Sequence, residues 1–161
     1  ITMQHMKLLM DADCLIKLTK SKLKELVCKN FSVVIPQLVK EEITYNAQEH
    51  LDAVIISENI ENKLITLNTM PFPSKKGEDA IFSIFQQGGY HAICSDDKRF
   101  IKRLRFFNIP YITPAVFIAL LLTKHKLTIK EAQETLHCLS SFVSDEEYNV
   151  VRAILENWGK Q

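Results

Sequence analysis

The chain has 161 residues, of which 47% are hydrophobic and 24% are charged, a composition that excludes disordered and collagen-like proteins. Its 20 basic and 19 acidic side chains leave a formal net charge of +1, which excludes a general attraction of the whole surface to nucleic acid or to an anionic membrane. Any charged partner must therefore be recognised by local clusters of charge. The length predicts one domain over residues 1–161, with a core of about 6–118 and a helical extension of about 119–161.

The cysteines and the longest apolar stretch bear on where the protein works. The four cysteines stand far apart without a C-x-x-C pair, so we expect reduced thiols rather than a zinc site or a disulfide framework. The stretch AVFIALLL, residues 115–122, is shorter than the roughly 20 residues that a membrane-spanning helix needs. We therefore expect a cytoplasmic protein without a membrane partner.

Short apolar runs alternate with longer segments of helical spacing along the chain up to Pro114. The runs that predict buried strands are residues 7–10, 32–35, 64–67, 91–94 and 110–113. The segments that predict helices are residues 37–51, the stretch from Glu78 to the Gly88-Gly89 pair, and residues 97–107. Residues 68–77 read as an exposed loop. This alternation predicts a three-layer α/β/α fold with a parallel sheet of about five strands.

After Pro114 the pattern changes to three consecutive helices. Thr113 and Pro114 suit an N-cap and a first helical residue. Thr128 and Ser144 are each followed three residues later by a glutamate, which is the spacing of a capping box. These helices form the predicted extension.

Carboxylates follow two of the predicted strands directly. Asp11 comes after the first strand, and Asp96 and Asp97 come after the fourth strand and Ser95. Ligands of open parallel sheets bind beyond the carboxyl ends of the strands, so these side chains would meet at one edge if the two strands are neighbours.

Two further acidic pairs are placed to join them, Glu41-Glu42 on one predicted helix and Glu78-Asp79 in the first turn of another. Acids at a helix start are often simple dipole interactions, and Glu41 and Glu42 alone would suit a solvated helix face. Gathered together, however, the carboxylates would repel one another unless a hard divalent cation neutralised them. The joint pattern therefore predicts bound Mg²⁺ or Mn²⁺ and the hydrolysis of phosphodiester bonds.

Four segments in this order, MDADCLI, VIPQLVKEEI, GEDAIFSIF and ICSDDKRF, resemble the motifs of the PIN-domain family of metal-dependent nucleases, which includes the VapC-like toxin ribonucleases. The resemblance places Asp11, Glu42, Asp79 and Asp97 at the catalytic, metal-binding positions, with Glu78 and Asp96 as neighbouring metal ligands that could exchange roles with the last two. It implies cleavage of single-stranded RNA, a homodimer and, in toxin members, a small antitoxin partner. Asp13 departs from the family pattern, where Asn is common.

An acidic pocket repels RNA, so a nuclease needs basic groups at its rim. One candidate cluster follows the fourth strand and consists of Lys98, Arg99, Lys102, Arg103 and Arg105. A second follows the first strand and consists of Lys17, Lys20, Lys22 and Lys24, and Lys75 and Lys76 add a third in the loop. Solvated helix faces are an equally good interpretation of these charges.

Two alternative functions remain open. Haloacid-dehalogenase-like phosphatases also carry Asp-x-Asp after their first strand, so Asp11 and Asp13 could serve as nucleophile and acid/base. The chain could also be a PIN-fold RNA- or protein-binding module without activity, although every acidic position is filled.

Overall fold

The computed structural model describes residues 6–45, 55–56, 58, 60, 63–73 and 76–160. In chain order its elements are β1 (Lys7–Met10), α1 (Ala12–Lys20), α2 (Lys24–Asn30), β2 (Ser32–Pro36), α3 (Gln37–Tyr45), β3 (Thr66–Asn68), α5 (Gly77–Gln86), β4 (Ala92–Cys94), α6 (Lys98–Phe106), β5 (Tyr111–Ile112), α7 (Val116–Thr123), α8 (Ile129–Leu139) and α9 (Asp145–Glu156). The strands form one sheet in the order β3-β2-β1-β4-β5, and every pair is parallel. The predicted parallel sheet of five strands is confirmed.

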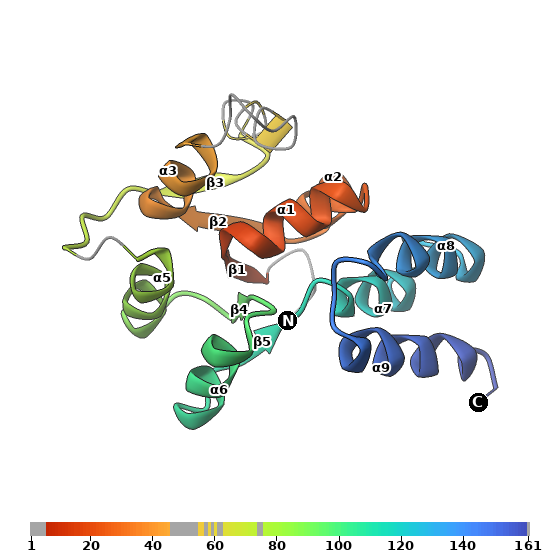
Figure 1. Cartoon of the computed structure of the whole chain (residues 1–161). Helices are drawn as coiled ribbons and strands as arrows, with labels where there is room; N and C mark the ends of the chain where they lie inside the picture. Colours follow the sequence, from red (N-terminus) through yellow and green to blue (C-terminus); the bar gives the residue numbers. More distant parts are fainter. Residues whose placement is uncertain are drawn as a thin grey trace.

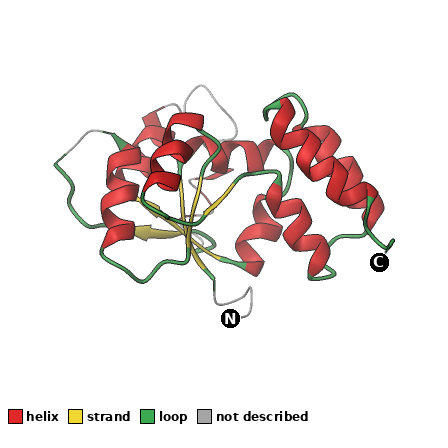
Figure 2. Ribbon diagram, turned by 90° about the horizontal axis from the view of Figure 1, so that it is seen from below, coloured by secondary structure: helices red, strands yellow, loops and turns green. Residues whose placement is uncertain are grey.

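Helices cover both faces of this sheet. In Figure 1, α1 and α2 lie on one side of the strands and α5 and α6 on the other. Figure 2 shows the strands in the middle with helices to either side. Right-handed crossovers explain the two layers, because the chain moves one way across the sheet from β1 through β2 to β3 and then the other way from β3 to β4 and β5. The three-layer α/β/α arrangement expected from the sequence is therefore confirmed.

The strands are continuous apolar runs because both of their faces are covered. After an exposed first residue, every residue of β1 and β2 is buried, and so is all of β4. The third predicted strand begins at Thr66, because Leu64 and Ile65 precede the pairing with β2. Of the predicted helix at residues 37–51, the structure describes Gln37–Tyr45, and the remainder lies outside the described residues.

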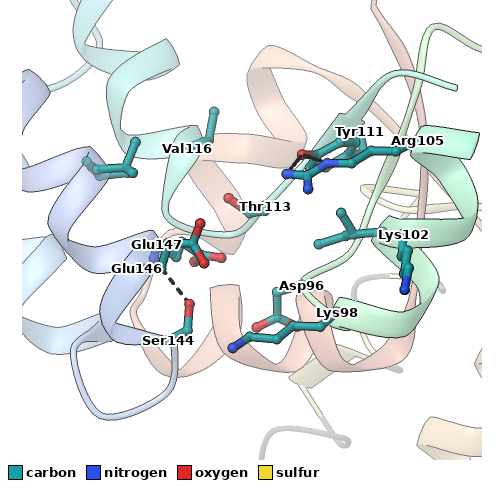
Figure 3. Close-up of a pocket in the computed structure, with 13 residues that line it drawn as sticks. Asp96, Lys98, Lys102, Arg105, Tyr111, Thr113, Val116, Ser144, Glu146 and Glu147 are labelled. Carbon is teal, nitrogen blue, oxygen red and sulfur yellow. Dashed lines mark hydrogen bonds between the residues drawn. The ribbon is translucent and has the colours of Figure 1, made fainter. Parts of the chain in front are cut away.

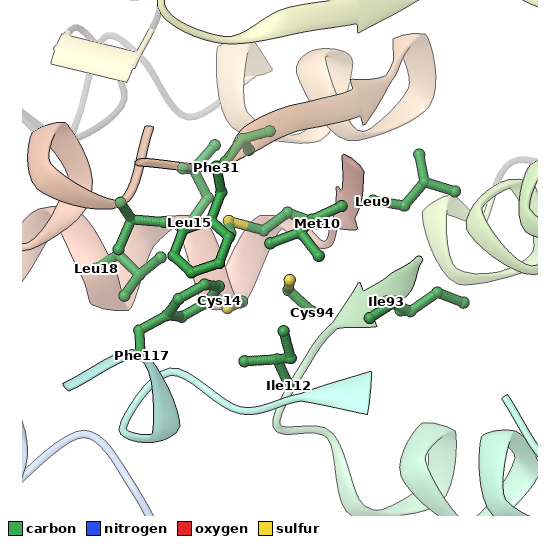
Figure 4. Close-up of a cluster of buried hydrophobic side chains, with 14 of the residues drawn as sticks. Leu9, Met10, Cys14, Leu15, Leu18, Phe31, Ile93, Cys94, Ile112 and Phe117 are labelled. Atoms are coloured by element: carbon green, nitrogen blue, oxygen red, sulfur yellow. The ribbon is translucent and has the colours of Figure 1, made fainter. Parts of the chain in front are cut away.

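The helices after β5 share the hydrophobic core of the sheet domain. Phe117 of α7 is completely buried, and its ring packs edge-on against that of Phe31, with 5.3 Å between ring centroids. Figure 4 shows both rings beside Leu15 and Leu18 of α1. A single core therefore joins the two parts of the predicted domain.

The three C-terminal helices are confirmed, and two of the three predicted N-caps are correct. The hydroxyl oxygens of Thr128 and Ser144 accept hydrogen bonds from the N–H groups of Glu131 and Glu147, 3.1 Å each. The prediction at Thr113 and Pro114 is wrong, because α7 begins at Val116 with Ala115 as its N-cap. Thr113 and Pro114 belong to the preceding turn, which the bond from the Val116 N–H to the Thr113 carbonyl closes at 3.1 Å.

The predicted end of a helix at the Gly88-Gly89 pair agrees with the structure. Gly88 and Gly89, which follow α5, both have a φ of +92°, a conformation that glycine adopts without strain. Within the described ranges no helix is long and apolar enough to cross a bilayer, and the most apolar one, α7, has 8 residues.

Candidate functional site

The carboxyl ends of β1 and β4 lie side by side in the middle of the sheet. Met10 pairs with Cys94, and the Asp11 N–H donates to the Cys94 carbonyl oxygen at 3.1 Å. The chain moves outward from β1 to β2 on one side and returns to β4 on the other, so the strand order reverses between β1 and β4. Open parallel sheets bind ligands at such a reversal. The first and fourth strands are therefore neighbours, which is the condition under which the sequence analysis expects Asp11 and Asp96 to lie at one edge.

Asp11 is a partly buried carboxylate that caps α1. Its Oδ1 accepts a hydrogen bond from the Cys14 N–H at 2.8 Å, and the buried Ser95 hydroxyl also bonds its side chain. Burial above all, with the nearby charges of Asp96 and Asp13, raises the pKa of Asp11 to about 7, against the lowering effect of the two hydrogen bonds. The structure therefore holds Asp11 where its negative charge is poorly neutralised.

Asp96 is the carboxylate of the β4 end that faces Asp11. The Lys17 ammonium of α1 forms an ion pair with Asp96 Oδ2. Burial lowers the pKa of Lys17, but the hydrogen bond and charge of Asp96 outweigh it and leave the pKa above its ordinary value. Lys17 is therefore the counter-ion of this acid within the chain, and its contact with RNA stays a prediction.

Asp97 points the other way, into the first turn of α6. Its Oδ1 accepts from the Phe100 N–H at 2.8 Å, so it is the N-cap of that helix. Its own N–H donates to the Ser95 Oγ at 3.2 Å. Ser95 thus links Asp97 and Asp11, whereas Asp96 is the acid whose charge acts on Asp11.

Glu42 reaches the site from α3. Its Oε1 accepts a hydrogen bond from the Gly77 N–H at the start of α5, 3.0 Å away. A side chain on residue 77 would place its Cβ 2.5 Å from the same oxygen, so the contact requires glycine there. Burial raises the pKa of Glu42, the bond from Gly77 lowers it, and the charge of Asp13 raises it. The charge of Asp13 therefore acts on both Asp11 and Glu42.

Arg103 of α6 binds the acids at the start of α5. Its Nη1 lies 2.8 Å from Asp79 Oδ1 and 3.6 Å from Glu78 Oε1, and its guanidinium covers the Phe82 ring, 4.1 Å from the centroid. Burial raises the pKa of Glu78, and the nearby charge of Asp97 adds to this effect. Arg103, predicted to contact RNA, is engaged by the predicted metal ligands of this segment.

The predicted basic clusters differ in how much they offer to a ligand. Lys98, Arg99 and Lys102 are exposed on α6, next to the end of β4. Lys24 is 3% exposed, so its place in the second cluster is wrong, and the Lys20 ammonium lies over the Phe142 ring, 5.2 Å from the centroid. The structure describes Lys76 just before α5, while Lys75 lies outside the described residues.

Glu147 is a functional candidate that the sequence analysis missed. Its spacing from Ser144 predicted a capping box, but its Oε2 instead accepts a hydrogen bond from the Ala115 N–H at 3.2 Å. Burial raises the pKa of Glu147, the Ala115 bond lowers it, and the charge of Asp96 raises it again. The C-terminal helix α9 therefore brings another carboxylate to Asp96 and Lys17, which no local sequence pattern indicates.

The donor chemistry of this cluster suits Mg²⁺ or Mn²⁺, which prefer carboxylate oxygens. As the side chains stand, the described part of the chain has no three acids, histidines or cysteines close enough together to hold an ion. Mg²⁺, however, is commonly bound by one or two carboxylates together with waters and substrate phosphates. Asp11 and Asp96 are two carboxylates near enough for the charge of Asp96 to raise the pKa of Asp11, and Asp96 forms an ion pair with the Lys17 ammonium.

Comparison with known proteins adds no information about this site. The chain matches no protein-family model, and no curated protein matches its sequence. An assignment of function therefore depends on the residues, their positions in the fold and their interactions.

Proposed function

We propose that this chain is a PIN-like, metal-dependent ribonuclease that hydrolyses phosphodiester bonds of single-stranded RNA with Mg²⁺ or Mn²⁺. The observation that carries the proposal is the position of Asp11 and Asp96, which follow adjacent parallel strands where the strand order reverses. Glu42 of α3, Glu78 and Asp79 of α5, and Asp97 after β4 are the further acids that the resemblance implies. In support, Glu42 accepts a hydrogen bond from the Gly77 N–H at the start of α5, and the charge of Asp97 acts on Glu78.

Each group has a distinct part in the proposed reaction. Asp11 and Asp96 would hold the ion, which supplies activation of a water and stabilisation of charge on the scissile phosphate. Ser95 orients Asp11 and Asp97 through its hydroxyl group, and Lys17 holds Asp96 in place through their ion pair. Arg103 compensates the charge of Asp79 and Glu78 at the other end of the site.

The test is cleavage of a labelled pool of single-stranded RNA by the purified protein with Mn²⁺ or Mg²⁺, beside EDTA. We expect cleavage with either ion and a loss of more than about a hundredfold in EDTA, because the ion activates the nucleophile. Glu134→Gln, on the exposed surface of α8, is the matched control and should leave the rate unchanged.

Asp13→Asn separates this proposal from the phosphatase alternative. Asp13 is exposed at the first turn of α1, and the nuclease proposal gives it no ligand role, so RNA cleavage should persist. A phosphatase would instead turn over small phosphate esters and lose that activity in Asp13→Asn. Tight RNA binding without cleavage in any metal would favour the inactive binding module, and each of these two results would contradict the nuclease.

The exposed cations of α6 give a second prediction. Replacing Lys98, Arg99 and Lys102 together by Ala should weaken RNA binding and lower the slope of log affinity against log salt by up to about 2, at about 0.7 per lost phosphate contact. Arg103 is kept, because it is bound to Asp79. The measurement is fluorescence anisotropy of a labelled RNA between low and moderate salt.

A matched triple variant controls for the loss of positive charge itself. Lys124, Lys126 and Lys130 are equally exposed but follow or belong to α7 and α8, so replacing them by Ala should leave the salt slope nearly unchanged. Equal slopes for both triple variants would remove the α6 cations from the RNA site. The homodimer and the small antitoxin implied by the resemblance stay predictions.

A further inference from the structure

A pocket of about 540 Å³ lies between the sheet domain and the C-terminal helix α9. Residues of α6, β5 and the turn after it form one side, and Ser144 with the first turns of α9 forms the other. Asp96 contributes to its lining, so the pocket opens beside the proposed metal site. This volume is within the usual range for small-molecule sites.

The two walls of the pocket carry opposite charges. Figure 3 shows Lys98 and Lys102 on the α6 side and Glu146 and Glu147 on the α9 side, with Asp96 between them. Apolar side chains line the space between these walls: Ile101, Val116, Val150 and Val151. A ligand that fits would be anionic at one end, carry hydrogen-bond donors at the other, and have an apolar body between.

Two lysine side chains of the cationic wall are available to bind a ligand. Among the described residues, neither the Lys98 nor the Lys102 side chain has a hydrogen-bond or ion-pair partner, and both residues are exposed. Arg105, by contrast, donates two hydrogen bonds to the Tyr111 hydroxyl, at 3.0 and 2.7 Å, and so fixes that ring in the wall. The two lysines therefore suit a phosphate, and Tyr111 supplies an aromatic surface nearby.

We propose that this pocket binds one nucleotide of the RNA strand next to the scissile phosphate. The inference rests on the proposed function. The phosphate contacts Lys98 and Lys102, the base enters between the apolar side chains, and the Glu146 carboxylate accepts hydrogen bonds from the base edge. The pocket gives the C-terminal helix a role in choosing the cleavage site.

The chemistry of the acidic wall sets the base preference. A carboxylate accepts hydrogen bonds and donates none, so it favours a base edge that carries adjacent N–H groups. Guanine carries an imino N–H beside an amino group, whereas uracil carries a single N–H between two carbonyl oxygens that repel the carboxylate. The pocket therefore prefers guanine and disfavours uracil.

The first test titrates GMP, AMP, CMP, UMP and inorganic phosphate into the full-length, metal-free protein by calorimetry. We expect GMP to bind about tenfold more tightly than UMP, and inorganic phosphate to bind most weakly. Glu146→Gln should reduce the preference for GMP to about twofold or less, because an amide can also donate to carbonyl oxygens. Asp145→Asn, in the same helical turn but outside the pocket, should leave the preference unchanged.

A second variant fills the pocket. Val150 lines it and is 53% exposed, so Val150→Trp occupies the space without disturbing the core and should weaken binding of all nucleotides at least tenfold. Ile154→Trp is the matched control, because Ile154 is one turn further along α9, 40% exposed and outside this pocket. Its nucleotide affinities should equal those of the wild type.

The outcomes separate this inference from the proposed function. If the wild type binds nucleotides but cuts no RNA, and Val150→Trp abolishes the binding, the pocket proposal is supported and the nuclease proposal is contradicted. RNA cleavage at unchanged sites in Val150→Trp, with no detectable nucleotide binding in the wild type, would keep the nuclease and overturn the pocket. Equal affinity for the four nucleotides and phosphate would overturn base recognition.

Discussion

Asp11→Asn is expected to remove RNA cleavage and, in the same protein, to increase stability in EDTA at pH 8. The loss of activity should exceed about a hundredfold, because even the outer partners of metal ligands are worth about 10- to 100-fold. The gain in stability follows from the position of Asp11, whose pKa is raised to about 7 by burial and by its acidic neighbours. Asparagine removes the unfavourable charge and remains a good N-cap for α1.

The direction of the stability change follows from how the free energy of unfolding depends on pH. The pKa of Asp11 is about 7 in the folded protein and 3.8 in the unfolded chain, so between these values the folded state binds more protons. The free energy of unfolding therefore falls as the pH rises from 4 to 7, by at most about 4 kcal/mol for this group. Asp11→Asn lacks this contribution, so its advantage over the wild type should be absent near pH 4 and largest above pH 7.

Urea denaturation of both proteins between pH 4 and pH 8 in EDTA measures the difference. Glu42, Glu78 and Glu147 also have raised pKa values, so the difference between the two curves, rather than either curve alone, reports Asp11. Adding Mn²⁺ should stabilise the wild type and have no effect on Asp11→Asn, because binding to the folded state alone shifts the equilibrium. A variant less stable than the wild type at pH 8 would contradict the burial argument, and equal stabilisation by Mn²⁺ would exclude Asp11 as a ligand.

Phe117→Ala should lower the free energy of unfolding by about 3 to 5 kcal/mol, the usual cost of removing a buried aromatic ring. Phe117 of α7 is 0% exposed and packs against Phe31, which precedes β2, so the cavity would open where the C-terminal helices meet the sheet domain. Because one core joins both parts, a single unfolding transition should shift as a whole. The measurement is the urea midpoint, followed by far-UV circular dichroism and Trp158 fluorescence.

Phe106→Ala is the matched control for this variant. Phe106 is 80% exposed at the end of α6, so the same substitution should change the free energy of unfolding by less than about 1 kcal/mol. Loss of the Trp158 signal before the circular dichroism signal in Phe117→Ala would show that the C-terminal helices unfold separately, and would contradict a shared core.

The sheet was predictable because its strands are short apolar runs that alternate with segments of helical spacing. In such a pattern a short apolar run is usually a buried strand of a parallel sheet. The runs before Asp11 and Pro36 became β1 and β2 almost residue for residue. Strand order was not predictable from these runs, because nothing local in the residues after Met10 says that β4 will be its neighbour. The capping residues Thr128 and Ser144 were predictable, since their bonds run to residues three positions away.

The site was predicted less completely, because the residues around a side chain do not show which distant segment that side chain will contact. Asp97 fits the motif better than Asp96, yet Asp97 caps α6 while Asp96 faces Asp11. Lys17 stands in a basic run but is the partner of Asp96. Glu147 looked like half of a capping box, and only the packing of α9 against the sheet domain brings it to the Ala115 N–H and to Asp96.

The central position of β1 in the sheet also determines when the site forms during translation. β1 leaves the ribosome early and at first has only β2 as a partner, whereas β4, which Asp96 follows by two residues, is made much later. Pairing between strands so distant in the chain is a late step of folding. A nascent chain that ends before β4 therefore holds Asp11 without Asp96, so the metal site that we propose stays incomplete until β4 has been made and paired with β1.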